Sequence, residues 1–198
     1  GVHHVYEEVR LKDILKAAAA CGNEDRILYF FSTSKITFPG AGLAMMAASP
    51  ANIAEIKKRM GVQTIGYDKL NQLRHVQYFK SADNIRAHMK KLGDALRPKF
   101  DLVAETLEKE LGGTGAARWT SPRGGYFVSL DTLPGCAKET VRLAKEAGVV
   151  MTGAGATWPY KKDPEDQNIR IAPTYPELDE LGQAMELFCL CVKLCAVR

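Results

Sequence analysis

A chain of 198 residues is long enough to bury a substantial hydrophobic core, and this length suits one large domain or parts of two. Apolar residues make up 46% of the sequence and charged residues 25%, which is the composition of an ordinary globular protein. The net charge of +4 comes from 27 basic and 23 acidic residues spread along the chain. Because they form no basic stripe with interleaved aromatic residues, the composition argues against nucleic-acid binding.

The sequence also lacks the usual signals for export or membrane insertion. It contains no signal-peptide pattern, and no apolar run approaches the roughly 18 residues that a membrane span needs. The five cysteines do not have the spacing of a disulfide framework. We therefore expect a protein of the reducing cytoplasm that does not contact a membrane.

The N-terminal part of the chain is predicted to alternate helices with strands. Apolar residues at helical spacing indicate a first helix, and the run Ile27-Leu28-Tyr29-Phe30-Phe31 is typical of a buried strand. Ser49-Pro50 is typical of a helix start, with proline at the first helical position. In chain order, the expected elements are a helix over 7–20, buried strands over 27–31 and 43–48, and helices over 49–60 and 68–79.

The rest of the chain is predicted to form a long helix followed by a small α+β unit. Ser81 can cap a helix that runs toward Gly112 and is kinked or interrupted at Pro98. Beyond this helix we expect strands over 126–130, 149–151 and 169–172, and helices over 137–147 and 176–197. We therefore expect residues 1–75 to be the end of a larger α/β layer and residues 76–198 to be a separate small domain.

The segment Ser32-Thr33-Ser34-Lys35 directly follows the first predicted strand and is a candidate reactive site. A lysine amine attacks an aldehyde only when it is partly neutral, and desolvation or a nearby cation lowers its pKa to that end. The hydroxyls of Ser32 and Ser34 can donate hydrogen bonds to a phosphate. Taken alone, the segment is better explained as a polar loop that carries a solvated lysine.

A second candidate is Arg170, in the middle of the strand-type segment Asn168-Ile169-Arg170-Ile171-Ala172-Pro173. An arginine between isoleucines should be partly buried, and it then needs an anion, for which a bidentate carboxylate is the best geometric partner. The segment follows a Gly-rich turn over 152–157. A structural salt bridge to another part of the protein is the alternative interpretation.

Taken together and in this order, the lysine loop, the Gly-rich turn and the arginine strand resemble the class I/II pyridoxal-phosphate aminotransferases of fold type I. They are most similar to a divergent aspartate-aminotransferase-like subgroup. The resemblance implies an α/β fold made of the end of the large cofactor-binding domain, residues 1–75, and the small α+β domain, residues 76–198. It also implies that Lys35 forms the Schiff base with the cofactor, that Ser32 and Ser34 contact the cofactor, and that Arg170 binds the substrate α-carboxylate.

The function implied by the resemblance is transamination. Pyridoxal 5′-phosphate would be the cofactor, and an amino group would move between an amino acid and a 2-oxo acid, without a metal. Aspartate as the amino donor follows from the subgroup alone. The family also implies a homodimer, because each active site borrows residues from the partner subunit. The segment Pro122-Arg123-Gly124-Gly125 fits strands that open near the substrate side chain, and Arg123 could face a second substrate carboxylate or be solvated.

Two features depart from the family pattern. Most class I enzymes place an arginine eight residues after the lysine to neutralise the cofactor phosphate, and Leu43 stands at that position. Ser32, Ser34 and the backbone amides of 40–42 are the groups that can compensate. The family's aspartate, which pairs with the pyridine nitrogen, would precede Gly1. We therefore expect the sequence to be a C-terminal fragment, and these residues alone to be catalytically inactive.

Two further functions remain open, since some bacterial transcription regulators use an aminotransferase-like domain to bind an effector, and the chain could also be an inactive truncated product. The motif Ser32-Thr33-Ser34-Lys35 also satisfies the Ser-x-x-Lys pattern of acyl-enzymes such as β-lactamases. That class needs a Lys-Thr-Gly segment on a later strand, and the sequence has Met151-Thr152-Gly153 instead. Acyl-enzyme chemistry is therefore disfavoured.

Overall fold

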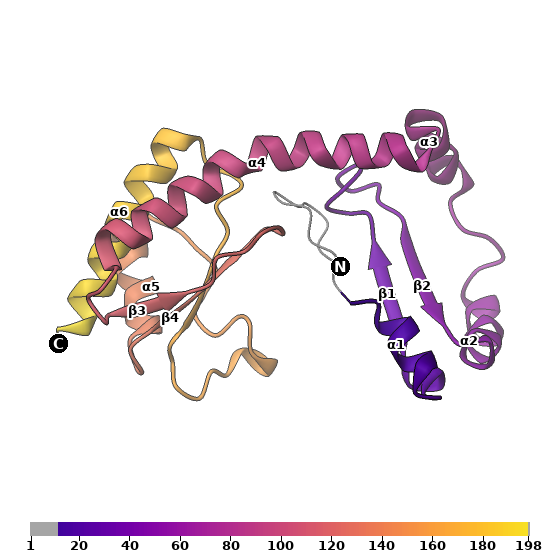
Figure 1. Cartoon of the computed structure of the whole chain (residues 1–198), viewed down its shortest axis with the longest axis horizontal. Coiled ribbons are helices and arrows are strands. Elements are labelled where there is room, and N and C mark those ends of the chain that lie inside the picture. The colour runs from indigo at the N-terminus through magenta and orange to yellow at the C-terminus, as the bar shows by residue number, and fades with distance from the viewer. Residues whose placement is uncertain (1–11, 198) are drawn as a thin grey trace. The chain divides into compact units, whose positions relative to one another are not determined.

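The computed structural model describes residues 12–197. The chain divides into two compact units, Gly1–Leu92 and Gly93–Arg198 (Figure 1). The long helix α4 (Ala82–Leu111) begins in the first unit and ends in the second, and it continues through Pro98 without interruption. Between residues 12 and 197, no helix is long and apolar enough to cross a membrane.

The first unit contains a two-stranded antiparallel sheet with helices before and after it. The two strands pair from Leu28↔Ala48 to Ser32↔Ala44, so residues 33–43 form the connection between them. This connection contains the predicted lysine loop. The elements are α1 (Ile14–Ala20), the 3-10 turn η1 (Glu24–Arg26), β1 (Leu28–Ser32), β2 (Ala44–Ala48), α2 (Pro50–Gln63) and α3 (Lys69–Phe79).

Local capping residues explain where these helices begin. The Ser49 hydroxyl accepts a hydrogen bond from the Asn52 N–H at 3.3 Å, with Pro50 in the first turn, as the sequence predicted for α2. The Asp68 carboxylate accepts from the Asn71 N–H at 2.9 Å and caps α3. These short-range contacts are why the sequence located the helix starts well. Of the first predicted helix, residues 7–11 lie outside the described residues.

The prediction that β1 and β2 are buried strands is wrong for the described residues. The side chain of Phe30 is 71% exposed and that of Met45 is 51% exposed, while Tyr29 and Phe31 on the other face of β1 are half-buried. Among residues 12–197, the two strands pair only with each other. An apolar run indicates that a strand can be buried, but it does not indicate which other segments cover the strand.

The second unit is built on a three-stranded antiparallel sheet in the order β3-β4-β5. The helices α5 and α6 pack against each other (Figure 1). The sheet, α4 and α6 all contribute side chains to the core, and the fully buried ones include Leu107, Leu130, Ile169 and Phe188. The elements are β3 (Ala117–Trp119), β4 (Val128–Thr132), α5 (Ala137–Glu146), the 3-10 turn η2 (Pro159–Lys161), β5 (Asn168–Ile171) and α6 (Leu178–Ala196).

In this unit one predicted strand is wrong and one strand was not predicted. Residues 149–151 do not form a strand, although all three are apolar and the two valines are β-branched. Val150 is 81% exposed, and the Val149 N–H donates to the carbonyl of Ala144 at the end of α5. Strand propensity forms a strand only where another strand pairs with it. The short strand β3 was missed because three residues carry too little periodicity to detect.

Cysteines of α6 serve as packing groups. Cys189, Cys191 and Cys195 are buried free thiols on this helix. Burial raises the pKa of Cys189 to about 12, so its thiol is protonated at neutral pH.

A buried carboxylate organises the loop that leads into β5. One oxygen of Asp163 accepts from the Gln167 N–H at 2.9 Å and the Asn168 N–H at 2.8 Å, and the other accepts from the Glu165 N–H at 3.1 Å. Burial by itself would raise the pKa of Asp163, but these backbone hydrogen bonds and the Lys138 charge outweigh it and hold the pKa below its ordinary value. The ionised carboxylate is therefore a structural anchor for the start of β5.

We expect Asp163→Asn to lower the free energy of unfolding at pH 7 by about 1–3 kcal/mol, because an amide cannot accept from all three N–H groups. A carboxylate whose pKa is lowered on folding stabilises the protein fully above its unfolded pKa of about 3.9, and this stabilisation is lost as pH falls through the lower folded pKa. The difference between wild type and variant, measured by urea denaturation, should therefore shrink below about pH 4. Asp101→Asn, at an exposed position of α4, is the control and should change stability by less than about 0.5 kcal/mol. An equal loss in both variants would contradict the anchor.

Candidate functional site

Lys35 is presented by a tight turn at the end of β1. The carbonyl of Thr33 accepts hydrogen bonds from the N–H groups of Ile36 at 2.8 Å and Thr37 at 2.9 Å, so residues 33–37 form one compact turn. The side chains of Thr33 and Ile36 are buried, at 8% and 3% exposure, while those of Ser34 and Lys35 are exposed. The turn is thus anchored by two residues and exposes the two that carry the predicted chemistry.

The hydroxyls of Ser32 and Ser34 lie together beside Lys35. Their oxygen atoms are 2.6 Å apart, and the Ser34 N–H donates to the Ser32 oxygen at 3.1 Å. A Cβ at Gly42 would lie 3.1 Å from the N, Cα and Oγ atoms of Ser34, so a larger residue there would require Ser34 to shift by a few tenths of an ångström. Both hydroxyls are exposed, and they can donate to an anion that binds next to the lysine.

The base of the loop is closed by Thr33 and Leu43. The Thr33 N–H donates to the Leu43 carbonyl at 2.8 Å, and the Leu43 N–H donates to the Thr33 hydroxyl oxygen at 2.8 Å. Leu43, which stands where the resemblance leads one to expect an arginine, therefore holds the loop through its backbone.

Two side chains of α3 also contact this loop, and the sequence analysis missed both. The Asn71 amide nitrogen donates to the Gly42 carbonyl at 3.3 Å, and His75 Nε2 lies 2.8 Å from the Thr37 hydroxyl oxygen. No local motif connects these positions, because they are separated from the loop by 29 and 38 residues. The one signal in the sequence was that His75 lies within a predicted amphipathic helix. That pattern by itself indicates only that the side chain packs against the core.

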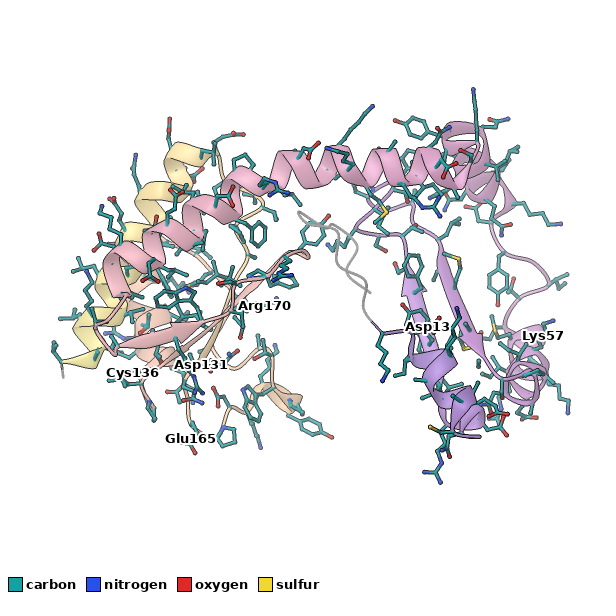
Figure 2. The ribbon with its side chains drawn as sticks, viewed as in Figure 1. Asp13, Lys57, Asp131, Cys136, Glu165 and Arg170 are labelled. Atoms are coloured by element: carbon teal, nitrogen blue, oxygen red, sulfur yellow. The ribbon has the colours of Figure 1, made fainter. Side chains whose placement is uncertain are left out.

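Arg170 lies on β5 opposite Ser129 of β4, in the second unit (Figure 2). Its side chain is half-buried, with Cζ 4.4 Å from the centre of the Phe127 ring and Nη2 3.4 Å from the Thr152 hydroxyl oxygen. The Nε atom is buried and has no hydrogen-bond partner. Across residues 12–197, no carboxylate pairs with this guanidinium, so the alternative of a structural salt bridge finds no support there.

A buried N–H without an acceptor is costly, and an arginine in this state is a good receptor for an anion. The planar guanidinium can meet a carboxylate with two parallel hydrogen bonds. Phe127 and Thr152 flank the group and restrict the orientations that it can adopt. Arg123, the other candidate for a substrate contact, is exposed in the segment before β4.

The Gly-rich turn is attached to the start of β5 through Asn168. The Gly155 N–H donates to the Asn168 carbonyl at 3.2 Å, and the Thr157 hydroxyl donates to the Asn168 side-chain oxygen at 2.5 Å. The Asn168 amide nitrogen donates in turn to Ser129 Oγ at 2.9 Å and to Asp131 Oδ1 at 2.7 Å. These contacts bring the turn and the arginine strand, 18 residues apart at Thr152 and Arg170, into one cluster.

The described part of the chain contains no group of three or more His, Cys, Asp or Glu side chains that could hold a metal ion. The lysine loop belongs to the unit Gly1–Leu92, and the Arg170 cluster belongs to the unit Gly93–Arg198.

Comparison with known proteins gives the same picture over the whole chain. A protein of Mycolicibacterium smegmatis assigned to the aminotransferases is 52% identical over 199 aligned residues, which are 100% of this chain and 46% of that protein. The crystal structure of an aspartate transaminase from Corynebacterium glutamicum superimposes with a TM-score of 0.93 at 43% identity, covering 98% of this chain and 46% of that one. The chain thus spans about half the length of the curated relatives it matches.

A more distant structure shares the fold. LysN, an α-aminoadipate aminotransferase of Thermus thermophilus solved in complex with N-(5′-phosphopyridoxyl)-L-leucine, superimposes with a TM-score of 0.80 at 19% identity, over 98% of this chain and 49% of LysN. The expected fold class, an α/β portion of a fold-type I aminotransferase, is confirmed by these superpositions. The family model described as aspartate amino-transferase matches residues 1–198, and with the 43% identical transaminase structure this establishes that the chain belongs to the aspartate amino-transferase family.

Proposed function

We propose that the protein carrying this chain is a pyridoxal-phosphate-dependent transaminase that moves an amino group between an amino acid, with aspartate as the donor, and a 2-oxo acid. The observation that carries the proposal is the exposed Lys35 on a rigid turn beside the paired hydroxyls of Ser32 and Ser34. Family membership supports the reaction class, and the aspartate transaminase of Corynebacterium glutamicum supports the donor.

The residues of the lysine loop fit the cofactor by their chemistry. The Ser32 and Ser34 hydroxyls are donors for a phosphate, and the Lys35 amine is the nucleophile that holds the cofactor aldehyde. Once bound, pyridoxal phosphate supplies an electron sink for the negative charge that develops at the substrate α-carbon. With leucine at position 43, the two hydroxyls and the backbone amides of 40–42 are the groups of this loop that we assign to the phosphate.

Lys35 has two roles in this proposal. Its amine anchors the cofactor before substrate arrives, and after substrate has displaced it the Nζ atom takes the proton from the substrate α-carbon. An amine that is tethered on a short turn performs the proton transfer without a diffusional step, which favours the reaction over transfer to bulk water.

Arg170 is assigned to the substrate α-carboxylate. Its buried and unpartnered Nε gives the site an unsatisfied donor that a carboxylate oxygen would satisfy. The Phe127 ring at 4.4 Å supports the guanidinium from one side, so a bound carboxylate is held in a defined plane. Fixing that plane orients the α-carbon–hydrogen bond of the substrate for proton removal.

The proposed assembly is a homodimer. Large apolar side chains between residues 60 and 78 are exposed, and concentrations of this kind commonly mark protein interfaces. They are Met60, Val62, Ile65, Tyr67, Leu70, Leu73, Val76 and Tyr78. Cytoplasmic location and the inactivity of these 198 residues alone stay predictions.

We expect Lys35→Ala, made in the protein as its gene encodes it, to lower kcat for transamination of aspartate with 2-oxoglutarate by about a thousandfold or more, because one side chain supplies both the anchor and the proton carrier. In wild type, pyridoxal phosphate followed by borohydride should leave a covalent adduct that peptide mass spectrometry locates at Lys35, and the variant should lose it. Lys57→Ala, at an exposed position of α2, is the control. Near-normal turnover in Lys35→Ala would refute the assignment.

Arg170→Lys keeps the positive charge but loses the planar fork. We expect the loss of one bidentate contact to cost about 2–3 kcal/mol, or roughly a 30- to 150-fold rise in KM for the amino acid. Borohydride should still trap the cofactor on Lys35 to the wild-type extent. Arg118→Lys on β3, whose guanidinium is exposed and paired with Asp131, is the matched control and should leave KM unchanged. If both variants behave alike, Arg170 is structural.

A further inference from the structure

Helix α3 contacts the lysine loop at two points one helical turn apart. Asn71 holds the Gly42 carbonyl near the end of the loop, and His75 meets the Thr37 hydroxyl directly after the Lys35 turn. The helix is itself capped by Asp68, which accepts from the Asn71 N–H. The loop therefore rests on a rigid element, although the contacting residues are 29 and 38 positions apart in the sequence.

His75 has a defined orientation and a defined proton position. The side chain is 8% exposed, and the ring makes an edge contact with Phe38, whose ring centre is 5.0 Å away. Its Nδ1 atom lies 2.8 Å from the Asn71 carbonyl oxygen, which can only accept a hydrogen bond, so Nδ1 carries the proton. In the neutral ring Nε2 is then an acceptor, to which the Thr37 hydroxyl at 2.8 Å can donate.

The Thr37 hydroxyl joins His75 to the rest of the loop. Its oxygen lies 3.0 Å from the Thr33 hydroxyl oxygen and 3.3 Å from the Thr33 carbonyl oxygen, and it can donate to either. The Thr33 oxygen in turn accepts from the Leu43 N–H at 2.8 Å. These hydrogen bonds form one continuous chain that ends at His75 and connects the residues on both sides of Lys35.

We propose that His75 is a positioning residue for Lys35. Its Nδ1 atom is held by the Asn71 carbonyl and its Nε2 atom lies 2.8 Å from the Thr37 hydroxyl oxygen, so the ring fixes the end of the turn that carries the lysine. This inference rests on the proposed role of Lys35 as the amine that holds the cofactor. His75 does not touch the reacting atoms; it acts through the geometry of the turn.

The test separates the acceptor from the packing of the ring. His75→Phe keeps an aromatic ring beside Phe38 but removes the acceptor, and His75→Gln restores an amide oxygen that can accept from Thr37. His88→Phe is the matched control, because His88 contacts Phe79 in the same aromatic cluster at 5.3 Å between ring centres and makes no hydrogen bond or ring contact with residues 33–43 in the described structure. Each variant is made in the protein as its gene encodes it.

The test measures, for each variant, the rate at which borohydride traps pyridoxal phosphate on Lys35, together with kcat and KM for the amino acid. His75→Phe should slow trapping and lower kcat by about tenfold to a hundredfold, the range expected for a misplaced reactive group, with KM changed less than about twofold. His75→Gln should recover to within about threefold of wild type, and His88→Phe should match wild type.

A separate measurement needs no activity and no variant. Imidazole ¹⁵N chemical shifts of the cofactor-free wild type should show the Nδ1-protonated tautomer of His75. The opposite tautomer would overturn the inference, and so would wild-type trapping rates in His75→Phe or a failure of His75→Gln to recover. If wild type forms no adduct at Lys35, the proposed function itself fails and the role of His75 with it. Adduct formation at Lys35 with equal rates in wild type and His75→Phe overturns the role of His75 alone.

Discussion

The pair of hydrogen bonds between Thr33 and Leu43 is the constraint on which the lysine loop depends. The regular pairing of strands β1 and β2 ends at Ser32↔Ala44. Thr33 and Leu43 extend it by one more pair of hydrogen bonds. The chain between these two residues must then reverse direction within a short distance, which the Thr33 carbonyl makes possible by accepting from two N–H groups of the turn. The position of Lys35 follows from hydrogen bonds on either side of it.

This construction explains how a leucine can occupy position 43. The contribution of Leu43 to the loop comes from its N–H and carbonyl, which any residue other than proline provides. The side chain at this position is therefore open to change without loss of the loop. Gly42 has less freedom, because a Cβ there would lie 3.1 Å from Ser34 and Ser34 would have to shift.

The second unit contains an unsatisfied hydrogen-bond donor, Arg170 Nε, whereas the candidate reactive group of the first unit, Lys35, is exposed. Arg170 retains a buried Nε without a partner, and the cation–π contact with Phe127 and the long contact with Thr152 compensate only part of its lost hydration. Around it, Asp163 and Asn168 each make several hydrogen bonds to the backbone or to neighbouring side chains. A rigid, hydrogen-bonded frame around one unsatisfied donor is the arrangement expected where a ligand completes the structure.

The sequence by itself determined the features that depend on short-range physics. Ser49-Pro50 located the start of α2, the alternation of Ile169, Arg170 and Ile171 indicated a half-buried arginine on a strand, and the lysine motif after β1 led to the family. Capping, periodicity and motif order depend on residues that are close in the sequence, so they can be recognised without knowledge of the tertiary structure.

Only the tertiary structure decided which distant residues meet. The contact of His75 with Thr37, the closure of the loop by Thr33 and Leu43, and the absence of a carboxylate beside Arg170 within residues 12–197 are consequences of packing. The same holds for residues 149–151, whose strand propensity was not realised because no strand pairs with them in the described chain. Local preference limits what a segment can become, and its partners in space determine what it becomes.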